Sequence, residues 1–341
     1  MKQKNNIWEV FRGIAALLVM FHHYTERYDS VVGHLGNWPV QSLYGGQFGV
    51  CMFFIFTGMF LMPSLIKSEN YAKYLIKRAN RLYPYYIPCV IITYVCMVST
   101  PPHHPLSSRV SSFGDFVVNL TMFQSYLGYN HVDGAYWTLA VQLIVYILMG
   151  GLFFILKKNI KHFISTVILW FGLDVLLSLY SIQGEVVPCQ SLLIMTVIHL
   201  FVQGLLIWFI TVEKNRKERI LALSILVISP LYSLFNFSMY YTIFNFCLIS
   251  IIYWVSVKKW DYNKSNIFTF LGSISFPMYL LHQNIGFLII RYMETIGLTQ
   301  EIFIFIPILI IILLSWGVTF FVEQYIIPLL CKIEKRELRL F

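Results

Sequence analysis

Residues 12–23 read Arg12-Gly-Ile-Ala-Ala-Leu-Leu-Val-Met-Phe-His22-His23, an apolar run that begins with an arginine and ends with two histidines. Eleven positions separate Arg12 from His23. On an α-helix their side chains therefore share one face, about 16 Å apart along the axis. An arginine at the centre of a bilayer costs about 2.5–3.5 kcal/mol, and it usually faces a protein interior or a wet cavity. We interpret this stretch as one wall of a chemical site inside a membrane helix.

The composition of the whole chain indicates the same class of protein. Its 341 residues are 58% hydrophobic and 12% charged, with a mean hydropathy of +0.69, which is not typical of a soluble domain. Apolar runs of about 18 or more residues recur, each long enough to cross a hydrocarbon core of about 30 Å. Unpaired backbone groups exclude open strands there. We predict an all-α, polytopic transmembrane helical bundle, formed by residues 1–341 as a single domain with no appended soluble domain.

The apolar runs predict about ten spans, at residues 7–25, 46–66, 82–99, 135–156, 162–181, 188–210, 219–236, 238–257, 267–291 and 302–331. With both termini in the cytoplasm, the inner segments hold 21 of the 25 Lys and Arg residues and the outer loops hold 3. This imbalance follows the positive-inside rule, and an odd number of spans would remove it. The first run lacks a small-residue cleavage site, so we expect a retained helix rather than a signal peptide. Because the basic residues lie in short clusters between spans, no binding of nucleic acid is expected.

Neither a disulfide framework nor a metal site is expected. The six cysteines lie within or at the ends of apolar runs and lack metal-ligand spacing, as is typical of buried thiols. His103 and His104 lie in the longest connection, residues 100–134, without the helical spacing and carboxylate support of a metal site.

A basic cluster begins the third span on its cytoplasmic side. It contains Lys77, Arg78 and Arg81, and the two arginines, three residues apart, share one helix face. The fork geometry of guanidinium groups suits phosphates. The positive-inside rule alone also accounts for such a cluster, so both interpretations stay open.

Polar residues interrupt three later spans. Trp137 starts the fourth span and is also typical of an interfacial anchor, while Gln142 in the same span needs a polar partner. Pro277 should kink the ninth span, and His282 near mid-membrane must be hydrogen-bonded or line a cavity. Glu323 lies near the inner end of the last span, where an ion pair is as good an explanation as a direct role.

Together these segments resemble acyltransferase family 3, the bacterial membrane proteins that O-acylate cell-surface glycans. The matching elements are Arg12 and His23, Gly49 to Gly58 (Gly-Val-x-x-Phe-Phe-x-x-Thr-Gly), Arg78 to Pro84 (Arg-x-x-Arg-x-x-Pro), Trp137 to Leu139, Ser275 to His282 and Glu323. They occur in the family's order across nearly the whole chain. Gln142 stands where the family often has Glu, and Cys51 stands where it often has an acidic residue. Gly49 and Gly58 also suit close helix packing.

The resemblance implies transfer of an acyl group, usually acetyl, from cytoplasmic acetyl-CoA to a hydroxyl of a glycan or lipid-linked saccharide at the outer face of a bacterial inner membrane. Arg78 and Arg81, with Lys77, are then expected to hold the coenzyme phosphates. Arg12 is placed to steady the pantetheine or the thioester carbonyl. His23, near the outer side, is the expected general base and takes a proton from the acceptor hydroxyl. Acetyl-CoA enters as a substrate, and no metal is required.

Other residues are weaker candidates for the same site. His22 lies 100° from His23 around the helix. Glu26 is expected to accept a ring N–H of His23 and fix its tautomer. Further candidates to line the site are Trp137, Gln142, His282 and Glu323. A covalent acyl-histidine and direct transfer both remain open.

Two other functions compete with acyl transfer. A transporter or flippase of a glycan or lipid would use the polar stripe as a path, but the chain has no internal repeat. A membrane scaffold would have no use for an arginine beneath a histidine inside a helix.

Overall fold

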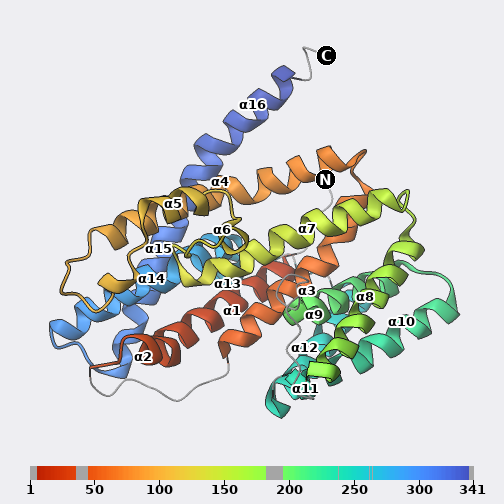
Figure 1. Cartoon of the computed structure of the whole chain (residues 1–341), viewed down its shortest axis with the longest axis horizontal. Coiled ribbons are helices and arrows are strands. Elements are labelled where there is room, and N and C mark those ends of the chain that lie inside the picture. The colour runs from red at the N-terminus through yellow and green to blue at the C-terminus, as the bar shows by residue number, and fades with distance from the viewer. Residues whose placement is uncertain are drawn as a thin grey trace. The chain divides into compact units, whose positions relative to one another are not determined.

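The computed structural model describes residues 6–35, 45–181, 195–236, 238–260, 262 and 264–337. Within these residues the chain forms helices joined by short connections, and it forms no β-strand (Figure 1). The predicted all-α class is therefore confirmed.

The longer helices alternate with short ones that lie mainly in the connections. The α-helices are α1 (Ile7–His22), α2 (Tyr28–Val31), α3 (Gly45–Ile66), α4 (Tyr71–Val98), α5 (Phe113–Asn119), α6 (Gln124–Leu127), α7 (Trp137–Ile155), α8 (Ile160–Ser181), α9 (Met195–Val212), α10 (Arg216–Ile228), α11 (Tyr232–Asn236), α12 (Met239–Lys258), α13 (Ile267–Ser273), α14 (Ser275–Thr295), α15 (Phe305–Phe321) and α16 (Ile327–Glu337). Two segments, His23–Arg27 and Val322–Ile326, are π-helices.

Among the described residues, six helices are long and apolar enough to cross a bilayer, or up to seven if the bent pair α13–α14 is one span. These seven coincide with seven of the predicted spans. The other three predicted spans, 7–25, 188–210 and 219–236, coincide with the shorter helices α1, α9 and α10, and residues 188–194 lie outside the described residues. The count of ten spans and the cytoplasmic position of both termini stay predictions.

The chain divides into two compact units. The first unit comprises residues 1–7, 50–76 and 144–263, and the second comprises 8–49, 77–143 and 264–341. All the residues predicted for the site lie in the second unit.

Close backbone contact joins α3 and α9 inside the first unit. A Cβ added to Gly58 would overlap the carbonyl oxygen of Phe201, and one added to Gly204 would overlap that of Ile55. Small residues at such crossings let helices approach closely in a membrane, so the packing role predicted for Gly58 is confirmed. Cys51, in the same unit, contacts the Tyr241 hydroxyl at 3.0 Å and is a free thiol.

The second unit is organised around α14, which packs along α15 (Figure 1). Fifteen of the 21 residues of α14 are buried. Four of these carry polar or charged side chains in its middle and last turns: His282, Gln283, Asn284 and Glu294. Burying such groups costs free energy unless they are paired, so these residues need polar partners inside this unit.

The bend before α14 differs from the predicted kink at Pro277. The chain turns by 76° between α13 and α14, at Ile274, three residues before the proline. Pro277 occupies the first turn of α14, where its missing N–H leaves no helical bond unmade. Since Pro277 has no N–H to donate to the Ser273 carbonyl, α13 ends at that residue. The proline therefore ends one helix and starts the next, and it does not kink a continuous one.

Candidate functional site

His23 lies where α1 gives way to a π-helix. The α-helical geometry predicted for the Arg12–His23 stretch continues to His22, and His23 begins the π-helix His23–Arg27. The backbone N–H of Tyr28 bonds to the carbonyls of His23 and Thr25. Short π-helical segments occur frequently at functional sites. Here the widened turn sets the direction of the His23 side chain.

The ring of His23 packs edge-to-face against the ring of His282 from α14. Their centroids are 4.7 Å apart and their planes are inclined by 79°. His22 and Phe287 flank His23 at 5.5 and 6.4 Å. Within the described residues, Nδ1 of His23 and Nε2 of His282 have no hydrogen-bond partner. The structure thus places a second imidazole against the predicted base, and each ring keeps one nitrogen without a hydrogen-bond partner among the described residues.

The tautomer of His282 follows from its own helix. Its Nδ1 lies 2.6 Å from the carbonyl oxygen of Tyr279. A carbonyl oxygen only accepts hydrogen bonds, so Nδ1 carries the hydrogen in the neutral ring and Nε2 carries the lone pair. The hydrogen bond required of a buried histidine is met by the backbone, and the free lone pair on Nε2 can accept a proton.

Hydroxyl groups fix the helix turn that carries His282. Tyr24 donates its hydroxyl to the His282 carbonyl at 2.9 Å. The hydroxyls of Tyr279 and Thr138 are hydrogen-bonded to each other at 2.8 Å, and the hydroxyl that accepts in this pair donates its own hydrogen to the carbonyl of Ala135. Thr138, the residue after Trp137, therefore acts on the site through Tyr279.

Asp133, near the end of the long connection of residues 100–134, is fully buried and contacts α14. Its Oδ1 accepts from the Ala135 N–H and its Oδ2 from the Asn284 N–H, each at 2.9 Å. The Asn284 side-chain amide donates to the carbonyl of Val132 at 2.9 Å. One carboxylate thus joins the start of the fourth predicted span to α14 two residues after His282.

Burial raises the pKa of Asp133 to about 6, although the N–H groups of Ala135 and Asn284 oppose the shift. The folded protein therefore holds this proton up to about pH 6, whereas an unfolded chain releases it near pH 4. The free energy of unfolding should fall by about 3 kcal/mol as pH rises through that window, and it should not fall further above it.

The Asp133→Asn variant lacks this titratable group. In thermal unfolding between pH 4 and pH 7, the wild-type Tm should fall more than that of the variant; parallel profiles would contradict this account.

Glu26 pairs with a different histidine from the predicted one. Its Oε2 lies 3.2 Å from Nδ1 of His22, four residues before it, and no contact with the ring of His23 is found. Residues four apart are neighbours on a helix surface. Glu26 is therefore placed to act on His22, and the predicted fixing of the His23 tautomer by Glu26 is wrong.

Arg12 lies on α1 with its charge partly neutralised. Its Nη1 is 3.3 Å from Oε1 of Glu9, one turn earlier, and both side chains are partly buried. Two glycines allow this part of α1 to pack closely against α13. A Cβ added to Gly13 would crowd the carbonyl oxygen of Phe268, and a Cβ added to Gly272 would overlap the carbonyl oxygen of Glu9. The backbone of α1 is therefore fixed at the level of Arg12.

The predicted donor residues lie together on α4. Lys77 and Arg81 are exposed, and Arg78, between them, is 5% exposed. The two arginines therefore do not form one uniform cationic surface. Arg81 presents its charge to the outside, whereas Arg78 directs its own into the protein.

The remaining candidates are spread over three helices. Trp137 is 41% exposed at the start of α7, which fits an interfacial anchor better than a site residue, and Gln142 is half-buried one turn and a half later. Glu323 is exposed within the second π-helix, with its Oε1 3.5 Å from the Tyr85 hydroxyl of α4.

No group of three or more His, Cys, Asp or Glu side chains suited to a metal occurs in the part of the chain that the structure describes. His104, one of the loop histidines, accepts a hydrogen bond from the Leu106 N–H at 3.2 Å.

Comparison with known proteins gives two matches. A family model described as "Acyltransferase domain" matches residues 5–322. An O-acetyl transferase of Shigella phage Sf6 is 26% identical over 186 residues, which cover 51% of this chain and 53% of that protein. The chain thus spans about half the length of the curated relative it matches. No solved structure matches.

Proposed function

Because the chain belongs to the family of acyltransferase domains, we propose that it is an integral membrane O-acyltransferase. It moves an acyl group, most simply acetyl, from acyl-CoA on the cytoplasmic side to a hydroxyl of a cell-envelope glycan or lipid-linked saccharide. The likeness to a phage O-acetyl transferase supports the reaction. The 21-to-3 distribution of Lys and Arg supports a bacterial inner membrane location with both termini in the cytoplasm.

The observation that carries the proposal is the pair of rings from His23 and His282, 4.7 Å apart at the end of α1. Acyl transfer to an alcohol needs a base at the hydroxyl, because a neutral hydroxyl is a weak nucleophile. Imidazole is the side chain whose unperturbed pKa suits that task near neutral pH.

In the proposed reaction, His23 takes the proton from the acceptor hydroxyl. The hydroxyl oxygen forms a bond to the acyl carbon, and the carbon–sulfur bond of the thioester breaks. The proton then passes from His23 to the departing coenzyme A thiolate, so that the imidazole is regenerated. His282, whose Nδ1 hydrogen is held by its own helix, presents a lone pair that stabilises the proton on the paired ring.

Sidedness offers a direct test of this function. Acetyl-CoA with a labelled acetyl group is enclosed on the cytoplasmic face of vesicles that carry the protein, and glycan is supplied on the other face. We expect labelled ester on the glycan. Glycan that crosses the membrane without consumption of acetyl-CoA would instead favour a transporter or flippase.

The donor site makes a separate prediction at Arg81. We expect Arg81→Ala to weaken acetyl-CoA binding about ten- to a hundredfold, since a charge-assisted contact to phosphate contributes about 1.5–3 kcal/mol. Calorimetry on the purified protein in detergent measures the affinity. Arg81 is preferred to the buried Arg78, whose removal also threatens folding.

Lys73→Ala is the matched control, because Lys73 lies two turns earlier on the same helix and is engaged by Glu69 at 2.5 Å. Its affinity should equal that of the wild type. Equal donor affinity in the Arg81→Ala variant would remove the donor site from this end of α4.

A further inference from the structure

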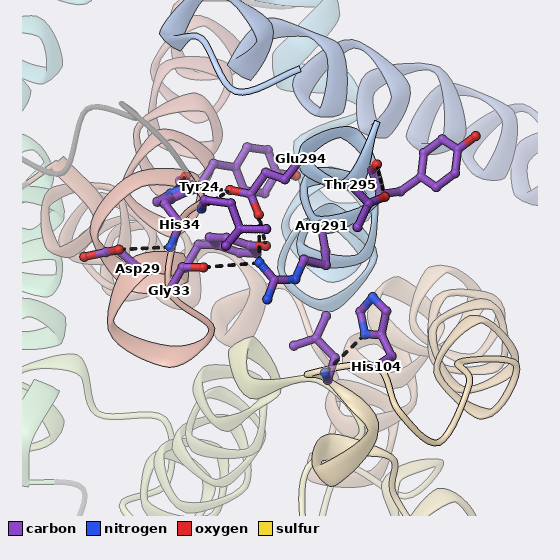
Figure 2. Close-up of polar contacts among 12 residues, drawn as sticks. Tyr24, Asp29, Gly33, His34, His104, Arg291, Glu294 and Thr295 are labelled. Atoms are coloured by element: carbon purple, nitrogen blue, oxygen red, sulfur yellow. Dashed lines mark hydrogen bonds and ion pairs between the residues drawn. The ribbon is translucent and has the colours of Figure 1, made fainter. Parts of the chain in front are cut away.

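A buried cluster of charged side chains joins the chain beyond the first π-helix to the last turns of α14 (Figure 2). Nδ1 of His34 lies 2.9 Å from Oε1 of Glu294, and the side chains are 1% and 0% exposed. On its other side, Nε2 of His34 lies 3.0 Å from the carbonyl oxygen of Tyr24. Neither His34 nor Glu294 belongs to any sequence motif described above. Their burial in a membrane protein calls for a functional explanation.

The hydrogen bonds to Glu294 favour its ionised form. Oε1 also accepts from the Leu35 N–H at 3.1 Å, and Oε2 accepts from the Tyr28 hydroxyl at 2.9 Å and from Arg291 at 3.2 Å. Three donors besides the histidine, one of them a guanidinium, stabilise a carboxylate rather than a carboxylic acid. Figure 2 shows Arg291 reaching Glu294 and the carbonyl of Gly33.

Both ring nitrogens of His34 therefore face acceptors. The carbonyl of Tyr24 can only accept a hydrogen bond, so Nε2 carries a hydrogen, and Nδ1 forms a second hydrogen bond with Oε1 of Glu294. The carboxylate of Asp29 accepts a hydrogen bond from the backbone N–H of His34 at 3.1 Å. The charged groups around the ring are Glu294 and Arg291 from α14 and Asp29 from α2, and His104 of the outer loop lies on the far side of Arg291 (Figure 2).

Tyr24, whose carbonyl contacts His34, links the two histidines of the site. Tyr24 follows His23 in the chain, its carbonyl is held by His34, and its hydroxyl donates to the carbonyl of His282. A Cβ added to Gly286 would overlap the Tyr24 ring, so this ring lies directly on the α14 backbone. Tyr24 is therefore fixed at both its main chain and its side chain.

The contacts give α14 two fixing points on the same partner segment. His282 and Glu294 are twelve residues apart, or about 18 Å along the helix. The Tyr24 ring packs on Gly286 between these two levels. Two contacts, one at each level, leave little freedom for the ring of His23 to leave that of His282.

We propose that His34 and Glu294 are positioning residues of the acyl-transfer site, a proposal that rests on the proposed function. The hydrogen bond between them fixes the His34 ring, which holds the Tyr24 carbonyl and thereby keeps His23 in ring contact with His282. They act through Tyr24 and touch no reacting atom. A misplacement of about 1 Å at a reacting group can cost about a hundredfold in rate, which sets the scale of the effect.

The test compares His34→Gln, Glu294→Gln and the double variant in the full chain in nanodiscs. Turnover is expressed per acetyl-CoA binding site counted by calorimetry, so that unfolded protein does not contribute. Each single variant should lower kcat about ten- to a hundredfold, with KM for donor and acceptor within about twofold of wild type. The double variant should lose less than the product of the single losses, since both residues act through the same hydrogen bond.

His104→Gln is the matched control, an outer-loop histidine that contacts no carboxylate, and its kcat should stay within about twofold of wild type. If the single variants lowered Tm but left kcat per binding site unchanged, the cluster would serve the fold only and the proposal would be overturned. If wild-type protein transferred no acyl group, the proposed function itself would fail, which is a different result from active wild type with equally active variants.

Discussion

Replacing His23 by alanine should lower acyl transfer by about a hundred- to ten-thousandfold, the range typical for loss of a general base. The ring of His23 packs edge-to-face against the His282 ring, and among the described residues its Nδ1 has no hydrogen-bond partner. Donor affinity should be unchanged, because the residues assigned to the coenzyme lie on α4. Steady-state turnover and calorimetry on one preparation measure both quantities.

His162→Ala is the control for this experiment, since His162 is an exposed histidine at the start of α8. It should retain wild-type turnover. A His23→Ala variant that kept more than about a tenth of the wild-type rate would show that another group is the base. His282, with its lone pair on Nε2, would then be the first residue to replace.

The largest effect on folding is expected from Gly272→Ala. A Cβ at this position would overlap three backbone atoms of Glu9, including its carbonyl oxygen. Backbone atoms cannot move aside as a flexible side chain can, so α1 and α13 would have to separate. We expect a loss of about 1–3 kcal/mol or more from this overpacking, measured as a fall in Tm in detergent, together with reduced activity, because Glu9 is the partner of Arg12.

Gly317→Ala provides the contrast. Gly317 is also a helical glycine of the second unit, on α15, but a Cβ there would meet nothing within 4 Å. Alanine is a better helix former than glycine by about 1 kcal/mol, so this variant should be as stable as the wild type or more so. Equal Tm values for the two variants would show that α1 and α13 do not meet at Gly272.

The helical fold, and the position of Arg12 and His23 on one helix face, could be predicted from the sequence because both depend on local or periodic features. Apolar runs of span length require helices whatever their neighbours, and the spacing of Arg12 and His23 is set by helix geometry alone. His282 was found because a buried imidazole in an apolar run needs an explanation. The ring contact between His282 and His23 could not be predicted from the sequence, because it depends on how α14 packs.

The errors have local physical causes. Glu26 lies three residues after His23 and four after His22, and both spacings make helix neighbours, so the sequence alone does not choose between them; the contact is to His22. The sequence predicts a kink at Pro277, but the chain turns at Ile274. A proline is compatible with the first turn of a helix, so Pro277 does not bend α14.

The supporting groups could not be predicted from the sequence at all. Asp133 looks like an ordinary loop residue before Gly134, and its importance comes from the backbone N–H of Asn284, 151 residues later. His34 and Glu294 likewise lie 260 residues apart. Such pairs leave no spacing pattern, because the fold alone brings them together.

The most direct test of the central claim is thiol release from acetyl-CoA by the purified protein in nanodiscs, with and without crude envelope glycan. The account predicts release that rises when glycan is added, with acetyl recovered as an ester on the glycan. Absence of release from acetyl-CoA, and then from longer-chain and succinyl donors, by folded protein with glycan present would contradict it.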